Sequence, residues 1–426
     1  MRLADMPEFK MTEIGRVPVD WTVEQVATLA NVDSESLSNK TAAEFSFRYI
    51  SLGDVDAGKL IGGHSPITFA EAPSRARRIV RSGDILFATV RPNLKGHFFA
   101  RRIDGNVVAS TGFAVIRAKE GIAAPAFIYQ SLLSGNVDVQ IEKLTVGSNY
   151  PAVNSTDVKG LLLPAPPLPE QQKIAAILTA VDDKLDVIAR RIEATQTLKQ
   201  GLMQTLFSRG IGTYSDNGRW VPHAEFKDSE LGEIPVKWEV VPQGMVTTFF
   251  NGRAYKLTEW EEAGTPVIRL QNLTGSGDKY YYSNLVLPEH QYVHKGDLLY
   301  MWSATFGPYI WWGEKAIYHY HIWKVECGDR VDKRFMYYSL SWLTAAMKGK
   351  THGSTMMHLT KAGMQKYPMV LPPIGEQRQI AAVLSGVDSK IELLRARQTH
   401  FQNLKRGLMQ KLITGEWRVN VNASET

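Results

Sequence analysis

The sequence holds a single cysteine, Cys327, among 426 residues. One cysteine cannot form an internal disulfide, and the paired spacings of a zinc site are absent, so a secreted, disulfide-stabilised protein is excluded. No run approaches the ~18 uninterrupted apolar residues of a membrane span. The first ten residues carry Asp5 and Glu8 and lack the apolar stretch of a signal peptide. We therefore expect a cytoplasmic protein.

Motifs that mark catalysis are also lacking. There is no HExxH, GxSxG or CxxC, and no Asn-Pro-Pro-aromatic or Asp-Pro-Pro-Tyr run of the kind found in adenine and cytosine N-methyltransferases. Residues 53–60 imitate the phosphate-binding loop GxxxxGK[ST], but Leu60 replaces the magnesium-binding hydroxyl, and a turn after a strand explains the run as well. His319 and His321 fall in an expected strand, where packing is a simpler role than metal binding. We expect no catalytic residue, no metal site and no cofactor bound by this chain.

Positive charge is in excess and unevenly distributed. Lys and Arg number 49 against 43 Asp and Glu, a net charge of +6, which favours a polyanionic partner without establishing one. Residues 72–103 alone hold eight basic residues and one acidic residue, although a solvated basic face would look the same. Arginine can neutralise phosphates or bind a guanine edge through two hydrogen bonds. The candidate contacts of this half, including a small polar run that could grip phosphate, are Arg75, Arg77, Arg78, Arg81, Arg91, Lys95, Arg101, Arg102, Lys143, Gly147, Ser148 and Asn149.

The second half of the chain offers a thinner basic set. It lies beside an aromatic stretch made of Trp302, Phe306, Tyr309, Trp311 and Trp312, rings that are more often core than platforms for bases. A Gly-Ser pair occupies the same place as in the first half. The candidate contacts of this half are Arg253, Tyr255, Lys256, Lys279, Lys348, Lys350, Gly353 and Ser354.

The chain repeats itself. Residues 170–178 (EQQKIAAIL) recur as 376–384 (EQRQIAAVL), and residues 198–206 (LKQGLMQTL) recur as 404–412 (LKRGLMQKL), at a constant offset of 206. About half of the positions from Glu170 to Leu206 are identical in the second copy. An opening element repeats as well, since residues 9–21 match residues 226–238, whereas the sequences between opening and ending have diverged.

The repeat divides the chain into variable domains and shared helical segments. The parts that we predict are a first variable domain (1–164), a first helical spacer (165–210), a linker (211–224), a second variable domain (225–370), a second helical spacer (371–416) and a C-terminal tail (417–426).

The shared segments are predicted to be helices with a narrow apolar stripe. Proline runs precede both, Glu170 and Glu376 place negative charge in the first turn, and Gly210 and Gly415 are plausible stops. Some 37 residues at ~1.5 Å each give a rod of roughly 55 Å. We expect the two stripes to pack against each other as an antiparallel coiled coil, with helices packed only on their own domains as the alternative. The seam residues are Ile174, Leu178, Val181, Leu185, Ile188, Leu198, Leu202, Ile380, Leu384, Val387, Ile391, Leu394, Leu404 and Leu408.

The variable domains are predicted to mix helices and strands. Short β-branched or aromatic runs bounded by Gly, Pro or Asn indicate strands. The fold class is therefore α+β: two mixed α/β domains separated by two long antiparallel helices, related by a pseudo-twofold internal repeat. The expected strands cover residues 47–55, 84–90, 112–118, 265–270, 297–302 and 317–325.

These motifs resemble those of the specificity subunits of type I restriction-modification systems. The resemblance rests on the PPLPEQ and PPIGEQ runs before the two helices, on their LKxGLMQ endings and on the ExGxxPVxW opening of each half, and it spans nearly the full length. It implies a non-catalytic subunit whose variable domains, residues 1–164 and 225–370, are target recognition domains that each read one half of a bipartite, asymmetric DNA site. It also implies that the helices set the half-site distance and dock two methyltransferase subunits for adenine N6 methylation.

The same resemblance places the chemistry on partners. Methyltransferase subunits would hold S-adenosylmethionine, and motor-nuclease subunits would use ATP and magnesium for translocation and cleavage. Two rivals stay open at this point: a coiled-coil scaffold that joins two protein-binding domains, and an autonomous enzyme.

Overall fold

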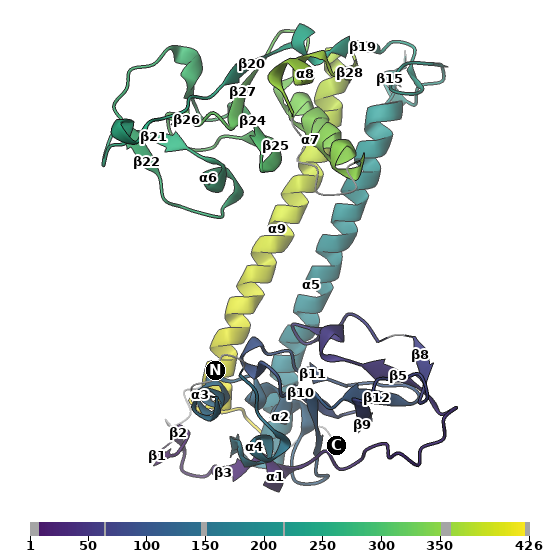
Figure 1. The fold of residues 1–426 in the computed structure, drawn as a ribbon, viewed down its shortest axis with the longest axis vertical. Helices are drawn as coiled ribbons and strands as arrows, with labels where there is room; N and C mark the ends of the chain where they lie inside the picture. Colours follow the sequence, from purple (N-terminus) through teal and green to yellow (C-terminus); the bar gives the residue numbers. More distant parts are fainter. Residues whose placement is uncertain (1–7, 64, 146–150, 216–217, 351–358, 422–426) are drawn as a thin grey trace. The chain divides into compact units, whose positions relative to one another are not determined.

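The computed structural model describes residues 8–63, 65–145, 151–215, 218–350 and 359–421. The chain forms two compact units, one made of residues 1–189 with 396–426 and the other of residues 190–395. Each unit therefore contains one variable domain together with part of both long helices (Figure 1). Among the described residues, no helix is long and apolar enough to cross a membrane.

The first variable domain contains two four-stranded sheets. One has the strand order β11-β10-β13-β4 and is antiparallel throughout, whereas the other has the order β8-β5-β12-β9 with β5 and β12 parallel. The strands are β4 (Ala30–Val32), β5 (Ser46–Ile50), β8 (Pro66–Thr68), β9 (Ala76–Val80), β10 (Ile85–Ala88), β11 (Phe98–Phe99), β12 (Val107–Ser110) and β13 (Phe113–Ala118).

The second variable domain repeats this topology although its sequence has diverged. Its sheets have the orders β25-β24-β27-β20 and β22-β21-β26-β23, and again one central pair, β21 with β26, is parallel. The strands are β20 (Thr247–Asn251), β21 (Thr265–Ile268), β22 (Tyr281–Ser283), β23 (Tyr292–Val293), β24 (Leu298–Ser303), β25 (Thr305–Ile310), β26 (Ala316–Tyr318) and β27 (Ile322–Cys327). The repeat that the sequence shows in the opening elements and the long helices thus includes the fold of the variable domains between them.

Each domain is completed by small elements near the long helices. A hairpin opens each repeat, β1 with β2 and β17 with β18, and a two-stranded sheet closes it, β3 with β14 and β19 with β28. The elements of the first domain are β1 (Phe9–Thr12), β2 (Gly15–Pro18), β3 (Thr22–Gln25), α1 (Val26–Leu29), α2 (Pro125–Leu132), α3 (Gly135–Leu144), α4 (Ser155–Gly160) and β14 (Leu162–Ala165). Those of the second are β17 (Phe226–Lys227), β18 (Ile234–Pro235), β19 (Glu239–Pro242), α6 (Leu270–Thr274), α7 (Lys333–Lys350), α8 (Lys361–Lys366) and β28 (Pro368–Leu371).

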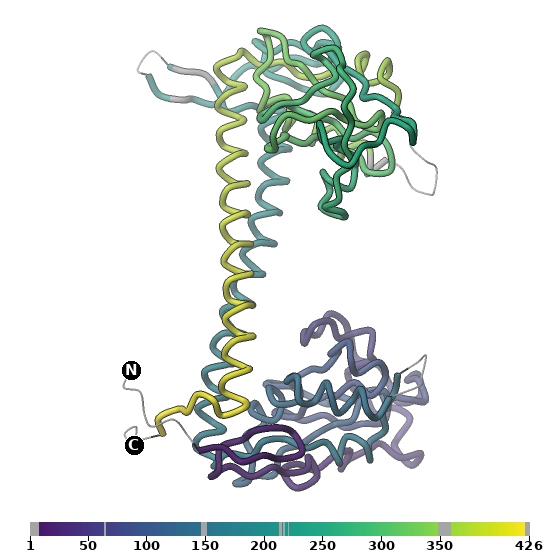
Figure 2. Tube along the Cα trace, turned by 90° about the vertical axis from the view of Figure 1, so that its left-hand side faces the viewer, coloured from purple at the N-terminus to yellow at the C-terminus, as the bar shows by residue number. Residues whose placement is uncertain are grey.

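The two long helices are α5 (Leu168–Arg209) and α9 (Ile374–Ile413). In the first unit the start of α5 packs on the end of α9, through Ile174 and Leu178 with Leu412. In the second unit the end of α5 packs on the start of α9. The helices are therefore antiparallel within each unit, as predicted (Figure 2). The same clusters also contain core residues of the adjoining domain, so helix pairing and domain packing occur together.

Most predicted seam residues are buried or half-buried, but Leu198 and Leu404 are wrongly assigned, because they are 56% and 40% exposed. The half-buried Ile192 continues the stripe four positions after Ile188, but Leu198 lies a step of six further on, which breaks the alternation of steps of three and four. Continuing that alternation leads to Lys199 instead, and to Lys405 in the second copy, both of which are half-buried. One layer of each seam is therefore polar.

Three further outcomes concern local boundaries. The predicted stops are confirmed, since Gly210 and Gly415 follow the helices with φ of 69° and 72°, a conformation that favours glycine. The strand predicted over residues 317–325 is wrong, because it is two strands separated by the turn 319–321. The strand predicted over residues 265–270 ends at Ile268, because helix α6 begins at Leu270.

Candidate DNA-recognition surfaces and the joints that hold them

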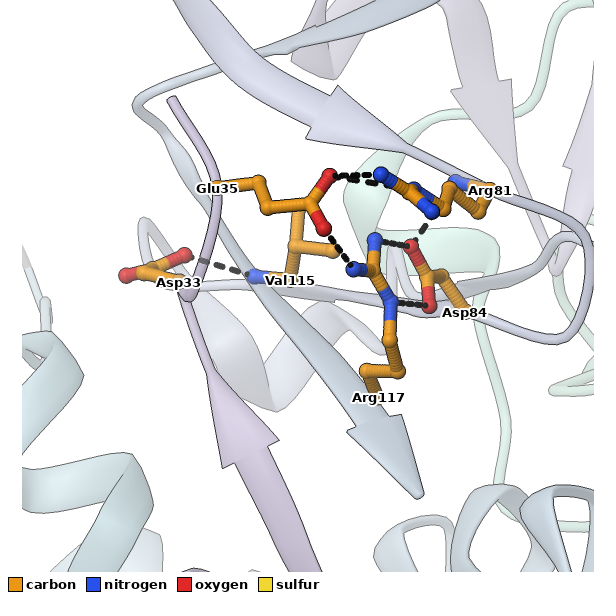
Figure 3. Close-up of polar contacts among 6 residues, drawn as sticks. All are labelled: Asp33, Glu35, Arg81, Asp84, Val115 and Arg117. Carbon is orange, nitrogen blue, oxygen red and sulfur yellow. Dashed lines mark hydrogen bonds and ion pairs between the residues drawn. The ribbon is translucent and has the colours of Figure 1, made fainter. Parts of the chain in front are cut away.

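The positive charge of the first domain is partly neutralised by acidic residues next to strands β4 and β10. Arg117 donates to Asp84 with an Nη2–Oδ2 distance of 2.7 Å and to Glu35 with an Nη1–Oε1 distance of 2.8 Å (Figure 3). Arg81 pairs with the other oxygen of Glu35, at 2.8 Å. The hydrogen bond to Asp84, whose side chain is 1% exposed, raises the pKa of Arg117. These side chains hold the sheets together, and sequence analysis missed Arg117, Glu35 and this role of Asp84.

Arg77 and Arg78 are also engaged within the domain. Arg78 lies 3.0 Å from Asp33, and the two side chains are only 24% and 7% exposed. The guanidinium of Arg77 lies over the ring of Phe69, 5.0 Å from its centroid. Three of the predicted phosphate contacts, Arg77, Arg78 and Arg81, thus have partners within the domain.

The other predicted contacts of the first domain have varied surroundings. Lys95 pairs with Asp138 at 2.8 Å, and Arg101 pairs with Asp183 of α5 at 2.6 Å. Arg75, Arg91, Arg102 and Lys143 are exposed. Gly147, Ser148 and Asn149 lie outside the described residues.

In the second domain the predicted basic set clusters with aromatic rings. Arg253 lies over the ring of Tyr255 at 5.4 Å and pairs with Glu259 at 2.7 Å, and Lys279 lies over Tyr281 at 5.4 Å. Lys256 is exposed; of the aromatic stretch, Trp311 is buried, Trp312 is 64% exposed and Trp302, Phe306 and Tyr309 are half-buried. The side chains of Lys348 and Lys350, and all of Gly353 and Ser354, lie outside the described residues.

The Glu-Gln pair that begins each long helix forms a buried joint. In the first unit Glu170, which is 1% exposed, accepts a hydrogen bond from Trp21 Nε1 at 3.1 Å and two from Arg418, at 2.8 and 2.9 Å. In the second unit Glu376 accepts one from Trp238 Nε1 at 2.8 Å. A buried carboxylate needs such donors, so the tryptophan of each opening element and the glutamate of each helix are required together.

The neighbouring glutamines tie the same joint to the domain. The amide nitrogen of Gln171 donates to the Pro166 carbonyl at 2.9 Å while its oxygen accepts from Ala124 N, just before α2. Gln377 repeats both bonds, donating to Pro372 at 2.8 Å and accepting from Asp332 N just before α7. The proline run, the Glu-Gln pair and the domain helix are thus one interlocked structure, which explains why these residues recur.

The polar layer of each seam is a three-residue node joining both long helices and a domain helix. In the second unit Lys199 Nζ lies 2.6 Å from Asp388 Oδ1, and Tyr338 of α7 donates to Asp388 Oδ2 at 2.8 Å. In the first unit Lys405 lies 2.7 Å from Asp182, to which Gln130 Nε2 of α2 donates at 2.8 Å. The lysines and aspartates are related by the offset of 206, a signal that could have identified them from the sequence.

No catalytic geometry emerges in the described part of the chain. No group of His, Cys, Asp and Glu suited to a metal occurs there. In the loop at residues 53–60, the Asp54 carboxylate accepts from Ser51 N at 2.7 Å, so an acidic group stands where a phosphate would need backbone donors.

Comparison with known proteins agrees with this architecture. The sequence profile described as type I restriction modification DNA specificity domain matches residues 18–196 and 235–400, most of the chain. The chain belongs to this family. The two matched segments each contain one variable domain and most of the helix that follows it, so the family's domain occurs twice here.

Individual relatives match this chain over nearly the full length of both proteins. A protein of Methanocaldococcus jannaschii named for the MjaX type I restriction enzyme specificity subunit is 28% identical over 431 residues, covering 96% of this chain and 97% of its own. The MjaVIII specificity subunit of the same organism is 26% identical over 97% of both chains. A chain from a structure of a type I restriction-modification complex has a TM-score of 0.58 at 23% identity, covering 94% of this chain and 99% of its own. A specificity subunit from M. genitalium gives 0.56 at 16%, covering 96% and 99%. These structures share the fold.

Proposed function

We propose that this chain is the non-catalytic, DNA-reading subunit of a type I restriction-modification complex. The observation that carries the proposal is the duplicated specificity domain, which matches the family over residues 18–196 and 235–400. Each target recognition domain reads one half of a bipartite DNA site. Because the domains share a topology but differ in their surface residues, the two halves of the site differ in sequence.

The helical spacers set the distance between the two half-sites. The helix α5 is continuous from the joint of the first unit to the joint of the second, over 42 residues, and α9 is continuous over 40. Two linked readers on one duplex bind with a high effective concentration only if the linker fits the spacing of the sites. The base pairs between the half-sites are then unread, and their number follows from helix length.

The outer face of each helix end docks one methyltransferase subunit. Near the end of α5, Leu198 and Gly201 are exposed, as are their repeats Leu404 and Gly407 near the end of α9. Half of the helix sequence has diverged between the copies, yet these positions, which the seam does not bury, are identical. A surface that occurs twice with the same residues suits two copies of one partner. We name it the repeated patch.

Chemistry resides on the partner subunits. The methyltransferase subunits hold S-adenosylmethionine and methylate adenine N6, and the motor-nuclease subunits use ATP and magnesium. The absence of catalytic motifs from the sequence supports a reader that depends on partners. The rival, a scaffold joining two protein-binding domains, receives no support from the family match.

A methylome measurement tests the proposal. The chain is expressed with its methyltransferase subunits in a host that lacks adenine methylation, and methylated adenines are mapped across the genome. We expect one motif in two parts separated by a fixed number of unread base pairs. Methylation by the isolated chain would support an autonomous enzyme instead, and verified expression of all subunits without any two-part motif would refute the proposal.

The docking surface is tested by charge insertion. Leu198→Glu together with Leu404→Glu places carboxylates on both repeated patches, whereas Glu193→Gln changes an exposed residue of α5 that is not repeated. We expect the double variant to lose at least about tenfold in affinity for methyltransferase subunits, since a charge in a buried contact is costly. Unchanged assembly of the double variant would exclude the repeated patch.

A further inference from the structure

In each domain a short turn connects a central strand of one sheet to a central strand of the other, and its residues differ in chemistry between the two domains. In the first domain β12 and β13 are joined through Thr111 and Gly112, whereas in the second β26 and β27 are joined through His319, Tyr320 and His321. The flanking strands occupy the same positions in their sheets. Rings thus replace small residues at the same place in the fold, and we name residues 319–321 the ring turn.

The backbone of the ring turn is held from both sides. Tyr320 N donates to the Arg253 carbonyl at 3.0 Å, and the Tyr320 carbonyl accepts from Trp302 Nε1 at 2.9 Å. His319 N donates to Ile268 O at 2.9 Å. Since these bonds come from three different segments, the turn presents its side chains in a fixed arrangement, which lowers the entropy cost of binding.

The side chains of the ring turn form a compact group that is partly open to solvent. The centroids of His319 and Tyr320 lie 4.4 Å apart, those of Tyr320 and His321 3.9 Å, and that of Trp302 lies 5.6 Å from His321. Tyr320 is nevertheless 40% exposed, unlike the fully buried Trp323 behind the group. Part of the Tyr320 ring is therefore accessible to a ligand.

The imidazoles are suited to bases rather than to phosphates. Burial, together with His321 and Arg269, lowers the pKa of His319 to about 4, and burial with Arg269 lowers that of His321. Both rings are therefore neutral near pH 7, each with one donor and one acceptor nitrogen. Such groups complement base edges, whereas phosphate binding favours cations.

Cationic side chains flank this end of both domains. Arg253 binds the ring turn through its backbone, and its Nη1 is buried without a hydrogen-bond partner. In the first domain the exposed Arg75 accepts a bond from Thr111 N through its carbonyl, at 2.9 Å. An arginine backbone thus borders this turn in both domains, but the Arg253 guanidinium pairs with Glu259, whereas the Arg75 side chain is exposed to solvent.

We propose that the ring turn, with Trp302 beside it, is the element by which the second domain discriminates bases in its half-site. The inference rests on the proposed DNA-reading function and adds the determinant of one half of the site. Tyr320 and His321 contact base edges, whereas Arg253, whose guanidinium pairs with Glu259, supports the turn through its carbonyl.

Methylome mapping of variants tests this assignment. Tyr320→Ala and His321→Ala are each compared with Trp312→Ala, which removes a 64% exposed ring elsewhere in the same domain. We expect the ring-turn variants to accept other bases at one or two positions of one half-site, with discrimination lowered at least about tenfold there. The other half-site and the spacer length stay unchanged in the same data, and Trp312→Ala keeps the whole motif.

Each outcome separates the inference from the function on which it rests. If the unmodified chain directs a two-part motif and both ring-turn variants keep it with full strictness, the assignment is wrong while the function stands. If a variant loses all methylation, thermal unfolding and binding to DNA without the site are measured, and the milder Tyr320→Phe is added. A folded variant that binds all DNA more weakly by the same factor overturns base reading, and one that loses only its preference for the site supports it.

Discussion

The ion pair between Lys199 and Asp388 permits a direct test of what holds the long helices in register. Its atoms lie 2.6 Å apart, and the side chains are 23% and 29% exposed, so water screens the pair only in part. Tyr338 donates to the second oxygen of Asp388, which ties the domain to the same point. We therefore expect Asp388→Lys to disturb both the helix pair and the seating of the domain.

The size of the effect follows from the geometry. Charge centres about 4 Å apart at an effective dielectric constant of about 20 attract by ~4 kcal/mol, and desolvation and side-chain ordering leave a net of about 1–2 kcal/mol. Replacing Asp388 with lysine turns this attraction into repulsion and removes the acceptor of the Tyr338 hydroxyl. The variant should lose about 2–4 kcal/mol of unfolding free energy.

A double-mutant cycle isolates the pair. Urea unfolding is measured for Asp388→Lys, Lys199→Asp and the swapped double variant, with the exposed Glu392→Lys as a control on the same helix. The swap should recover at least about 1 kcal/mol relative to the sum of the single changes, and it should also restore the strict spacer of the methylated motif. If the double variant is as unstable as the sum of the two single variants, the node does not set the register.

Three further predictions use other features of the chain. Alanine at the exposed Arg75 and Arg102 should lower the salt dependence of DNA binding by about one unit of slope per lost phosphate contact. Arg78→Ala breaks a half-buried ion pair and should chiefly reduce thermal stability. Equal salt slopes for all three variants would contradict this assignment. Inserting four residues near Ala194 should change the permitted spacer between half-sites, and a fixed spacer in the methylome would refute the role of the helices. Burial lowers the pKa of His97 to about 3, so below pH 6.5 the unfolded chain takes up a proton that the folded chain does not. The free energy of unfolding should therefore fall by about 2 kcal/mol from pH 7 to pH 5. If a His97→Gln variant shows the same pH dependence of unfolding, groups other than His97 cause this fall.

The basic run shows where sequence reasoning fails. Eight basic residues within 72–103 indicate a charged face, but the acids that pair with Arg78 and Arg81 come from residues 33–35, which follow β4 and lie far away along the chain. Charge counted in a window contains no information about such partners. The sequence therefore identified which residues carry the positive charge. It could not distinguish the side chains that form ion pairs within the domain from those that face solvent.

The ring turn shows a second limit. A β-branched and aromatic run over residues 317–325 satisfies the composition of one strand, and nothing local distinguishes a strand from two strands joined by a pinned turn. The bonds that fix the turn come from Arg253, Trp302 and Ile268, which only the sheets bring together.

The sequence by itself determined the duplicated plan, the two long helices and their ends, because helices follow local periodicity and a repeat is visible without any contact. The tertiary structure alone decided that the seam lysines pair with aspartates of the facing helix, how a glutamate and a tryptophan, 149 residues apart in the first joint and 138 in the second, close each joint, and which side chains remain exposed for a ligand. These outcomes depend on contacts between distant segments, whose free energy comes from burial and from partners supplied by the folded chain.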